Sequence, residues 1–252
     1  MTIKNTKVDV SDIHEIPAIM REMRLTAMAE ALEKDISDPN SGLMSPTERM
    51  TRIILAEYNS RCDKKTERFV KRAKLKMPSA DLFDLDESGD RTLDTDILTR
   101  LSTCEWIRQR SNLIVTGPCG SGKTWISCAL SVKACEQFMN VRYYSANQLI
   151  LKMKAMSEKE YLAAHEILGK LDLLIMDDVG LMSYDLESCR IFFEILDTRY
   201  QSGSTLFISQ FPVSSWYDLF SDKTYAESVL SRAIEKSYRL ELQGSDMRVR
   251  KN

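Results

Sequence analysis

The sequence predicts an α/β protein, with a parallel five-stranded sheet preceded by a small all-α domain. From residue 112 onward, short apolar runs alternate with helical stretches, which is the pattern of a parallel sheet covered on both faces. The run Leu173-Leu174-Ile175-Met176 is apolar throughout, as expected of a strand that is buried on both sides. Residues 13–77 show helical spacing and no convincing strand.

Composition narrows the class of protein. Of the 252 residues, 43% are apolar and 29% are charged, which argues against a disordered or fibrous chain. The 35 basic residues nearly balance the 37 acidic residues, which argues against a uniformly basic, histone-like binder but allows local patches. No secretory signal is visible, the cysteines form no C-x-x-C pair, and only two histidines are present. We therefore expect a cytoplasmic protein with reduced thiols and no zinc site.

The first domain is expected to span residues 1–78. A turn cluster at Asp38–Gly42 precedes a second helix, for which Ser45 is the expected N-cap, Pro46 the first residue and Glu48 the partner in a capping box. Its apolar row consists of Met50, Ile53, Ile54 and Tyr58. Further along, the same row becomes basic, so either the helix bends near Ser60 or its second half leaves the local core.

This basic row is a candidate DNA-binding surface. It repeats cations on one helical face, which suits contacts with the phosphate backbone rather than with base edges. Its members are Arg61, Lys64, Lys65, Arg68, Lys71 and Arg72. The alternative is a solvated helix face that pairs with the acidic segment at residues 79–100, which is expected to be a linker to a core at residues 101–252.

The core is expected to contain five strands and the helices between them. The predicted strands are Leu113–Thr116, Val141–Ser145, Leu173–Asp177, Thr205–Ser209 and Tyr238–Leu242. The clearest helical stretches are Lys123–Phe138, Leu186–Tyr200 and Tyr225–Ser237.

A phosphate-binding loop follows the first of these strands. It fits the pattern G-x-x-x-x-G-K-[ST] between an apolar strand and a helix, and consists of Gly117, Pro118, Cys119, Gly120, Ser121, Gly122, Lys123 and Thr124. Glycines allow backbone N–H groups to converge on phosphate oxygens, and the helix N-terminus favours the same anion. Lys123 is expected to reach the β- and γ-phosphates of ATP, and the Thr124 hydroxyl to bind Mg²⁺.

Two acids follow the buried strand about fifty residues later. Asp177 is expected to hold Mg²⁺ through water, and Asp178 to polarise the attacking water. The alternative for Asp178 is a cap on the following helix. Ser209 and Gln210 end the next strand and are expected beside Asp177; Gln210 is the first choice for sensing the γ-phosphate, and a turn hydrogen bond is the alternative.

Trp125 follows the loop threonine. Packing against the sheet is the favoured interpretation, and stacking on adenine as part of the nucleotide site is the alternative.

The chain resembles the IstB-family ATPases, helper proteins of bacterial insertion sequences within the AAA+ proteins and related to DnaC-type helicase loaders. The segments that carry the resemblance are Met23–Ala29, Leu82-Phe83-Asp84, Asn112–Thr124, Ser209–Val213 with Trp216, Tyr238–Leu242 and Gly244–Arg248. It implies a AAA+ core without the usual helical lid domain. It also implies a nucleoid-associated bacterial protein that oligomerises on double-stranded DNA, recruits or stimulates a transposase and disassembles on ATP hydrolysis.

The resemblance also implies roles for two arginines. Arg232, in Val229-Leu230-Ser231-Arg232, resembles the arginine finger that is offered to the ATP of a neighbouring subunit, and Arg248 resembles a sensor arginine for the γ-phosphate. AAA+ enzymes most often carry Glu where this chain has Asp178, so slow turnover is expected because the carboxylate is one methylene shorter. A DnaC-type helicase loader, a small-molecule P-loop kinase and an ATP-gated DNA clamp are alternative functions.

Overall fold

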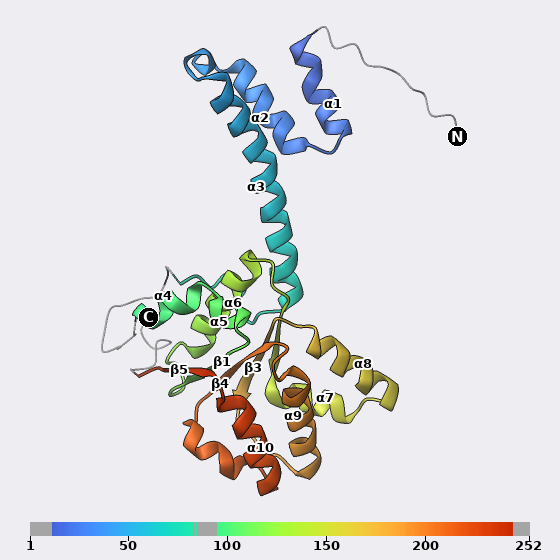
Figure 1. The fold of residues 1–252 in the computed structure, drawn as a ribbon, viewed down its shortest axis with the longest axis vertical. Coiled ribbons are helices and arrows are strands. Elements are labelled where there is room, and N and C mark those ends of the chain that lie inside the picture. Colours follow the sequence, from blue (N-terminus) through green and yellow to red (C-terminus); the bar gives the residue numbers. More distant parts are fainter. Residues whose placement is uncertain (1–11, 83, 85–94, 244–252) are drawn as a thin grey trace. The chain divides into compact units, whose positions relative to one another are not determined.

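The computed structural model describes residues 12–82, 84 and 95–243, and it divides into two compact units, residues 1–65 and 66–252. The division falls within the long helix α3 (Figure 1). None of the described helices is both long and apolar enough to cross a membrane.

The first unit is helical in its described part. Its elements are η1 (Ile13–Glu15), α1 (Ile16–Glu22), α2 (Thr26–Ser37), η2 (Ser41–Leu43) and the start of α3 (Pro46–Ala73). The capping box is confirmed, because the Glu48 backbone N–H donates to Ser45 Oγ at 3.2 Å and Ser45 N–H donates to Glu48 Oε2 at 2.8 Å. Buried Glu57 accepts hydrogen bonds from the backbone N–H groups of Ala27 and Met28, so α3 satisfies the first turn of α2.

The apolar row predicted for this helix is only partly buried. Ile53 is 6% exposed, but Met50, Ile54 and Tyr58 are 58%, 48% and 62% exposed. The row predicted from helical spacing is therefore apolar in sequence, but only Ile53 is buried. The remainder of α3 is continuous through Ser60, and its residues Phe69, Val70 and Ala73 pack in the core of the second unit.

The second unit is built around a five-stranded parallel sheet with the order β2-β3-β4-β1-β5. Its strands are β1 (Asn112–Thr116), β2 (Val141–Ser145), β3 (Leu173–Val179), β4 (Ser204–Ser209) and β5 (Ser237–Glu241). Its further helices are α4 (Thr95–Ser102), α5 (Glu105–Arg108), α6 (Lys123–Glu136), α7 (Ala146–Lys154), α8 (Glu158–Gly169), α9 (Leu186–Arg199), η3 (Val213–Leu219) and α10 (Lys223–Ile234). The predicted α/β class and all five predicted strands are confirmed.

Alternate strand residues enter two different cores. Leu173 and Ile175 face the core shared with α4, α5 and α6, whereas Leu174 and Met176 face the core shared with α7, α9 and α10 (Figure 1). Both faces of β3 are therefore covered, which explains its uninterrupted apolar sequence. The parallel arrangement brings the carboxyl ends of β1, β3 and β4 to one edge of the sheet, and the polar residues of the site follow these ends.

Candidate nucleotide site

The phosphate-binding loop connects β1 to α6, as the motif predicted. Gly117 has a φ of +147°, and a Cβ atom there would lie 2.4 Å from the carbonyl oxygen of Leu242, so a side chain at this position is excluded. Gly122, with a φ of +86°, forms the N-cap of α6. The N-terminus of α6 therefore begins directly at the loop, where its backbone N–H groups favour an anion.

Lys123 is 8% exposed, and its ammonium group lies over the loop. Its Nζ atom donates hydrogen bonds to the carbonyl oxygens of Gly117 at 2.7 Å and Pro118 at 2.6 Å. Among the other loop residues, Ser121 is buried and Cys119 is exposed. The positive charge is thus held against the loop that would bind the phosphates.

Thr124 and Asp177 come together at the edge of the sheet. The Thr124 hydroxyl donates to Asp177 Oδ2 at 3.2 Å, and Asp177 is 1% exposed. The Tyr143 hydroxyl, on the neighbouring strand β2, also donates to Asp177 Oδ2, and Lys76 Nζ lies 3.9 Å from the same oxygen. A hydroxyl and a carboxylate are hard oxygen ligands of the kind that Mg²⁺ prefers, so these residues fit the ion.

Asp178 occupies a distortion of β3. The register between β3 and β4 shifts between Met176 and Val179, and Asp178 has a φ of +61°. This bulge redirects its carboxylate from the alternation of a regular strand. Burial, reinforced by the charge of Asp177, raises the pKa of the Asp178 carboxyl, while Lys76 and Lys123 oppose the rise. Asp178 is not the cap of the next helix, because that position of α9 is held by Asp185.

Ser209 and Gln210 end β4, which lies between β1 and β3. Ser209 is buried, donates its hydroxyl to the carbonyl oxygen of Val179 at 2.7 Å and accepts from the backbone N–H of Phe211 at 3.1 Å. Ser209 therefore makes the turn hydrogen bond that sequence reasoning gave as an alternative. Gln210 is exposed at this edge.

Trp125 packs against the core beneath α6, and its indole N–H donates to the carbonyl oxygen of Asp81 at 3.3 Å. Arg248 lies outside the described residues, as do residues 83 and 85–94 of the acidic segment.

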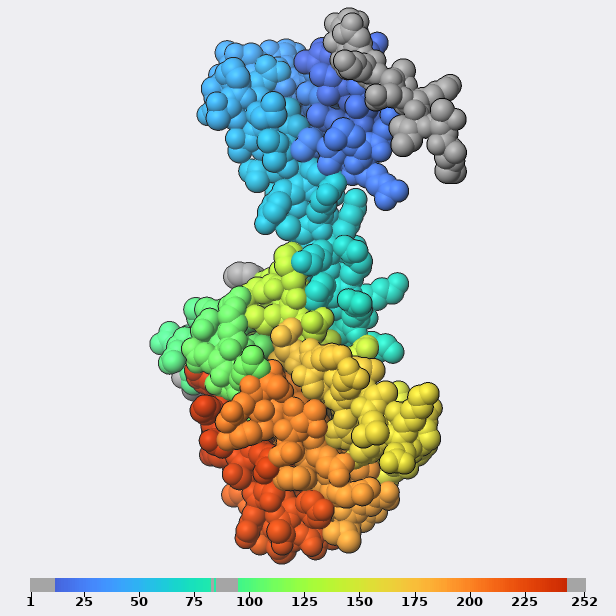
Figure 2. All heavy atoms as spheres, turned by 45° about the vertical axis from the view of Figure 1, so that its right-hand side comes forward, coloured from blue at the N-terminus to red at the C-terminus, as the bar shows by residue number. Residues whose placement is uncertain are grey.

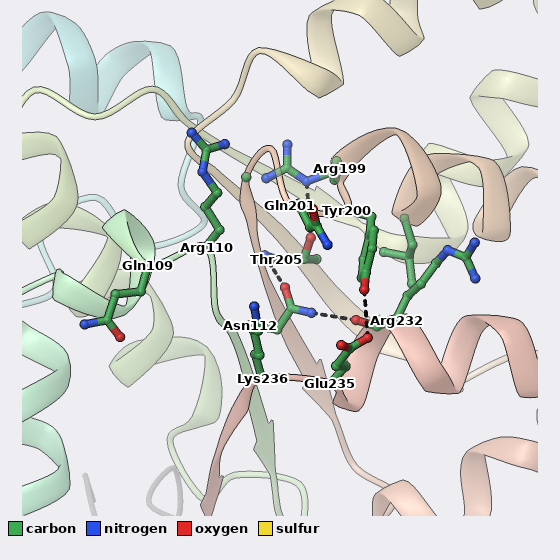
Figure 3. Close-up of a pocket in the computed structure, with 12 residues that line it drawn as sticks. Gln109, Arg110, Asn112, Arg199, Tyr200, Gln201, Thr205, Arg232, Glu235 and Lys236 are labelled. Atoms are coloured by element: carbon green, nitrogen blue, oxygen red, sulfur yellow. Dashed lines mark hydrogen bonds between the residues drawn. The ribbon is translucent and has the colours of Figure 1, made fainter.

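Arg232 lies beside the amino ends of the strands, whereas the phosphate loop follows their carboxyl ends. Its carbonyl oxygen accepts a hydrogen bond at 2.9 Å from the side chain of Asn112, the first residue of β1, whereas the phosphate loop follows the last residue of that strand (Figure 3). At about 3.3 Å per residue, the backbone at Asn112 lies roughly 16 Å from the loop. Arg232 is therefore remote from the phosphate loop of its own chain.

The Arg232 side chain is 27% exposed and has partners within its own chain. Its Nε and Nη2 atoms donate to Asp197 Oδ1 at 3.0 and 2.6 Å, and its guanidinium lies 4.5 Å from the centre of the Phe193 ring. It borders a pocket of about 320 Å³ that also contains the cations Arg110, Arg199 and Lys236 (Figure 3).

The six candidate DNA-binding cations of α3 are exposed, three in each unit. Arg61 donates to Glu57 Oε1 at 2.7 Å and to the carbonyl oxygen of Arg24 at 3.2 Å, so its guanidinium takes part in the packing of the first unit. Arg68, Lys71 and Arg72 belong to the second unit. In Figure 2, side chains of this teal part of α3 project from the surface.

Sequence reasoning missed Tyr143, Lys76 and Asp197. Tyr143 lies in a strand without a recognisable motif, and its contact with Asp177 depends on β2 being the neighbour of β3. Lys76 and Asp197 reach the candidate residues only through tertiary packing. A tyrosine within a strand, a lysine just after a helix and an aspartate within a helix carry no sequence pattern that distinguishes them from other residues of their types.

The strand order, the loop between β1 and α6, and the acidic end of β3 define an ATPase of the AAA+ class. Within that class, the chain belongs to the family described as IstB-like ATP binding protein, which it matches over residues 18–252. It is 33% identical over 230 residues to the insertion sequence ATP-binding protein y4pL of Sinorhizobium fredii, covering 91% of this chain and 94% of the relative. It is 39% identical over 197 residues to the ATP-binding protein of insertion sequence IS1162 from Pseudomonas fluorescens, covering 78% and 85%.

Solved structures confirm the fold. DnaI matches with a TM-score of 0.55 and 17% identity over 70% of this chain and 94% of that chain. DnaA from Aquifex aeolicus bound to AMPPCP matches with a TM-score of 0.53 and 21% identity over 68% and 52%. At these identities the likeness is one of fold.

Proposed function

We propose that this chain is an ATP-dependent DNA-binding regulator of DNA transposition. It oligomerises on target DNA with ATP between its copies, recruits or stimulates a transposase, and disassembles when ATP is hydrolysed. The family and the insertion-sequence relatives support the transposition role. The helicase-loader alternative is supported by a likeness of fold alone.

The position of Arg232 carries the proposal. An arginine that neutralises the charge on a transferred phosphoryl group can accelerate hydrolysis by ~10³–10⁵. Arg232 is remote from its own phosphate loop, so such a role requires the ATP of a second copy. Lys123 and Thr124 of one copy and Arg232 of the next then share one ATP, and the copies associate head to tail.

Within one copy, different residues bind the triphosphate, hold the metal ion and assist hydrolysis. Backbone N–H groups of residues 117–122 and the ammonium of Lys123 bind the triphosphate, and Thr124 and Asp177 would hold Mg²⁺, which supplies charge neutralisation at the phosphates. Asp178 accepts a proton from the attacking water, and Gln210 senses the γ-phosphate. Hydrolysis removes the γ-phosphate, to which Arg232 is attracted. Its loss weakens the association of the copies.

Mixing two inactive variants tests the shared site. Lys123→Ala removes ATP binding but retains Arg232, and Arg232→Ala retains ATP binding but lacks the finger. We expect each variant alone to hydrolyse ATP at least a hundredfold more slowly than the wild type. An equimolar mixture recovers part of the activity, since hybrid sites are complete. Two variants that are each folded, as judged by circular dichroism and thermal unfolding, but remain inactive when mixed would contradict the sharing of Arg232.

The DNA contacts are proposed for the cations of α3. Phosphate contacts make binding tolerant of sequence and sensitive to salt, with a slope of about −0.9 in log K against log salt for each phosphate neutralised. The double variant Arg68→Ala/Lys71→Ala is expected to reduce that slope by about two. Lys159→Ala, which removes an exposed cation of α8, is the control and should leave it unchanged.

Electron microscopy with duplex DNA and a non-hydrolysable ATP analogue tests the assembly directly. We expect ATP-dependent oligomers on DNA, which Arg232→Ala abolishes. Capture by a transposase of an insertion sequence, rather than by a replicative helicase, separates the transposition helper from the helicase loader. A chain that stays monomeric with both nucleotide and DNA would contradict the proposal.

A further inference from the structure

Asp177 is a buried carboxylate with an unusual set of neighbours. Three groups donate hydrogen bonds to it: the hydroxyls of Thr124 and Tyr143, and the backbone N–H of Asp178 at 2.8 Å. The fourth neighbour is a cation, since Lys76 Nζ lies 3.9 Å from Oδ2. Thr124, Asp177 and Asp178 are accounted for by the ATP site, whereas Lys76 is not.

Lys76 belongs to the segment that continues from the end of α3. The backbone of this segment is fixed to the core, because Arg142 Nη1 on β2 donates to the carbonyl oxygen of Arg72 at 2.7 Å. Leu75 and Ala80, on either side of Lys76, are buried in the core that contains α6. Ala73 is fully buried in the same core. The segment therefore holds Lys76 within reach of Asp177, and Lys76 lies four residues after the last α3 cation, Arg72.

A carboxylate that already faces an ammonium group binds a second cation less well, because the two positive charges repel each other and share the same oxygen. Since the Lys76 side chain is 54% exposed, it can swing into solvent when another cation takes its place at Asp177. Lys76 thus resembles a replaceable counter-ion of Asp177 rather than a member of a fixed structural ion pair.

We propose that Lys76 is a positioning residue that acts through Asp177 and links α3 to the ATP site. It competes with Mg²⁺ for the carboxylate and sets the Mg²⁺ concentration at which ATP binds. Duplex DNA on Arg68, Lys71 and Arg72 draws the lysine towards the phosphate backbone, which frees Asp177 for the metal. This last step rests on the proposed DNA binding by α3.

The first test measures binding of a fluorescent, non-hydrolysable ATP analogue to the full chain as Mg²⁺ is titrated without DNA. Lys76→Met is expected to lower the half-saturating Mg²⁺ concentration by about threefold, the size of effect that a half-exposed pair supports. Lys74→Met, which removes an exposed lysine two residues earlier, is the matched control and should behave as the wild type. An unchanged Mg²⁺ requirement in Lys76→Met overturns the proposal. So does weaker nucleotide binding at every Mg²⁺ concentration without a shift of the midpoint, since that assigns Lys76 to the phosphates instead.

The second test repeats the titration with duplex DNA, with DNA binding followed separately by fluorescence anisotropy. DNA is expected to lower the half-saturating Mg²⁺ concentration of the wild type and of Lys74→Met, but not that of Lys76→Met. If Lys76→Met binds DNA and responds to it as the wild type does, the link is refuted. If the wild type does not bind DNA at all, the proposed function fails, while the first titration still decides whether Lys76 competes for Asp177.

Discussion

The hydroxyl of Thr124 lies 3.2 Å from the carboxylate of Asp177, although 53 positions separate them in the chain. The contact joins the first turn of α6 to the end of β3. It brings a neutral and an anionic oxygen together beside the phosphate-binding loop, a pair of hard oxygen ligands that fits Mg²⁺.

Substitutions at the two neighbouring acids should separate metal binding from hydrolysis. Asp177→Asn removes the anionic ligand, so we expect it to weaken Mg²⁺-dependent nucleotide binding by at least tenfold. Asp178→Asn is expected to leave that binding intact but to slow hydrolysis by about 10²–10⁴, because the proposed general base is lost. Isothermal titration with and without Mg²⁺, together with phosphate release, measures both effects. Equal loss of binding in both variants would show that Asp178 also contacts the metal.

Tyr143 should affect the metal site through Asp177. Its hydroxyl donates to Asp177 Oδ2, and burial raises the pKa of the Tyr143 phenol, so the group remains a donor. Tyr143→Phe leaves the carboxylate less firmly oriented, and we expect the Mg²⁺ concentration for half-maximal ATP binding to rise by about tenfold. Tyr144→Phe is a matched control, since Tyr144 packs on the other face of the sheet. Equal effects of the two substitutions would indicate a change in strand packing instead.

The ion pair between Arg232 and Asp197 should oppose assembly. In the proposed assembly Arg232 exchanges this partner for the phosphate of a second copy, so Asp197→Asn is expected to lower the protein concentration for ATP-dependent assembly by about two- to fivefold. Sedimentation at a series of protein concentrations measures the change. A higher concentration requirement in Asp197→Asn would mean that Asp197 orients the arginine for the neighbour's ATP.

The central features of the nucleotide site were predictable because each is encoded by local sequence. The loop has a fixed spacing, and the strand before Asp177 is apolar without interruption. Observed strand limits differ from the predicted ones by at most two residues, the difference at the end of β3 arising from its bulge near Asp178. That bulge has no signature in the sequence.

Other features depended on which elements become neighbours. Helical spacing predicts that Met50, Ile54 and Tyr58 share a face, but it does not determine whether another element covers that face, and these side chains are exposed. Tyr143 reaches Asp177 only because β2 lies beside β3, an order that the strand sequences do not specify.

His165 should make stability depend on pH. It lies on α8, with Nδ1 3.1 Å from Thr198 Oγ1 of α9, and burial lowers its pKa although Glu194 opposes the shift. The unfolded chain therefore takes up a proton first as pH falls, so this stability is present above about pH 6.5 and is lost at lower pH. His165→Gln should reduce the fall in melting temperature between pH 7.5 and 5.5 by about 2 °C. An identical fall in both proteins would show that His165 titrates alike in the folded and unfolded chains.

Arg199 should be essential to the stability of the second unit. It is 2% exposed, and its guanidinium donates to the carbonyl oxygens of Leu168, Leu171 at 3.1 Å and Ser204 at 2.5 Å, and to Thr205 Oγ1 at 3.2 Å. It thereby joins the end of α8 and the following turn to the start of β4. Burial lowers the pKa of Arg199 to about 10, so the side chain remains charged at neutral pH and needs all of these acceptors.

Arg199→Lys keeps the charge but loses the planar, branched donor group, and a single ammonium cannot reach four acceptors on three segments. We expect it to lower the free energy of unfolding by about 2–4 kcal/mol, because buried carbonyl groups lose their partners. Arg110→Lys is the control: Arg110 lines the same pocket and donates to the carbonyl oxygen of Ser202, but it is exposed, so its replacement should cost less than about 1 kcal/mol. Denaturant unfolding of the two variants measures the difference. Equal stability would mean that water satisfies the carbonyl groups around Arg199 as well as the guanidinium does.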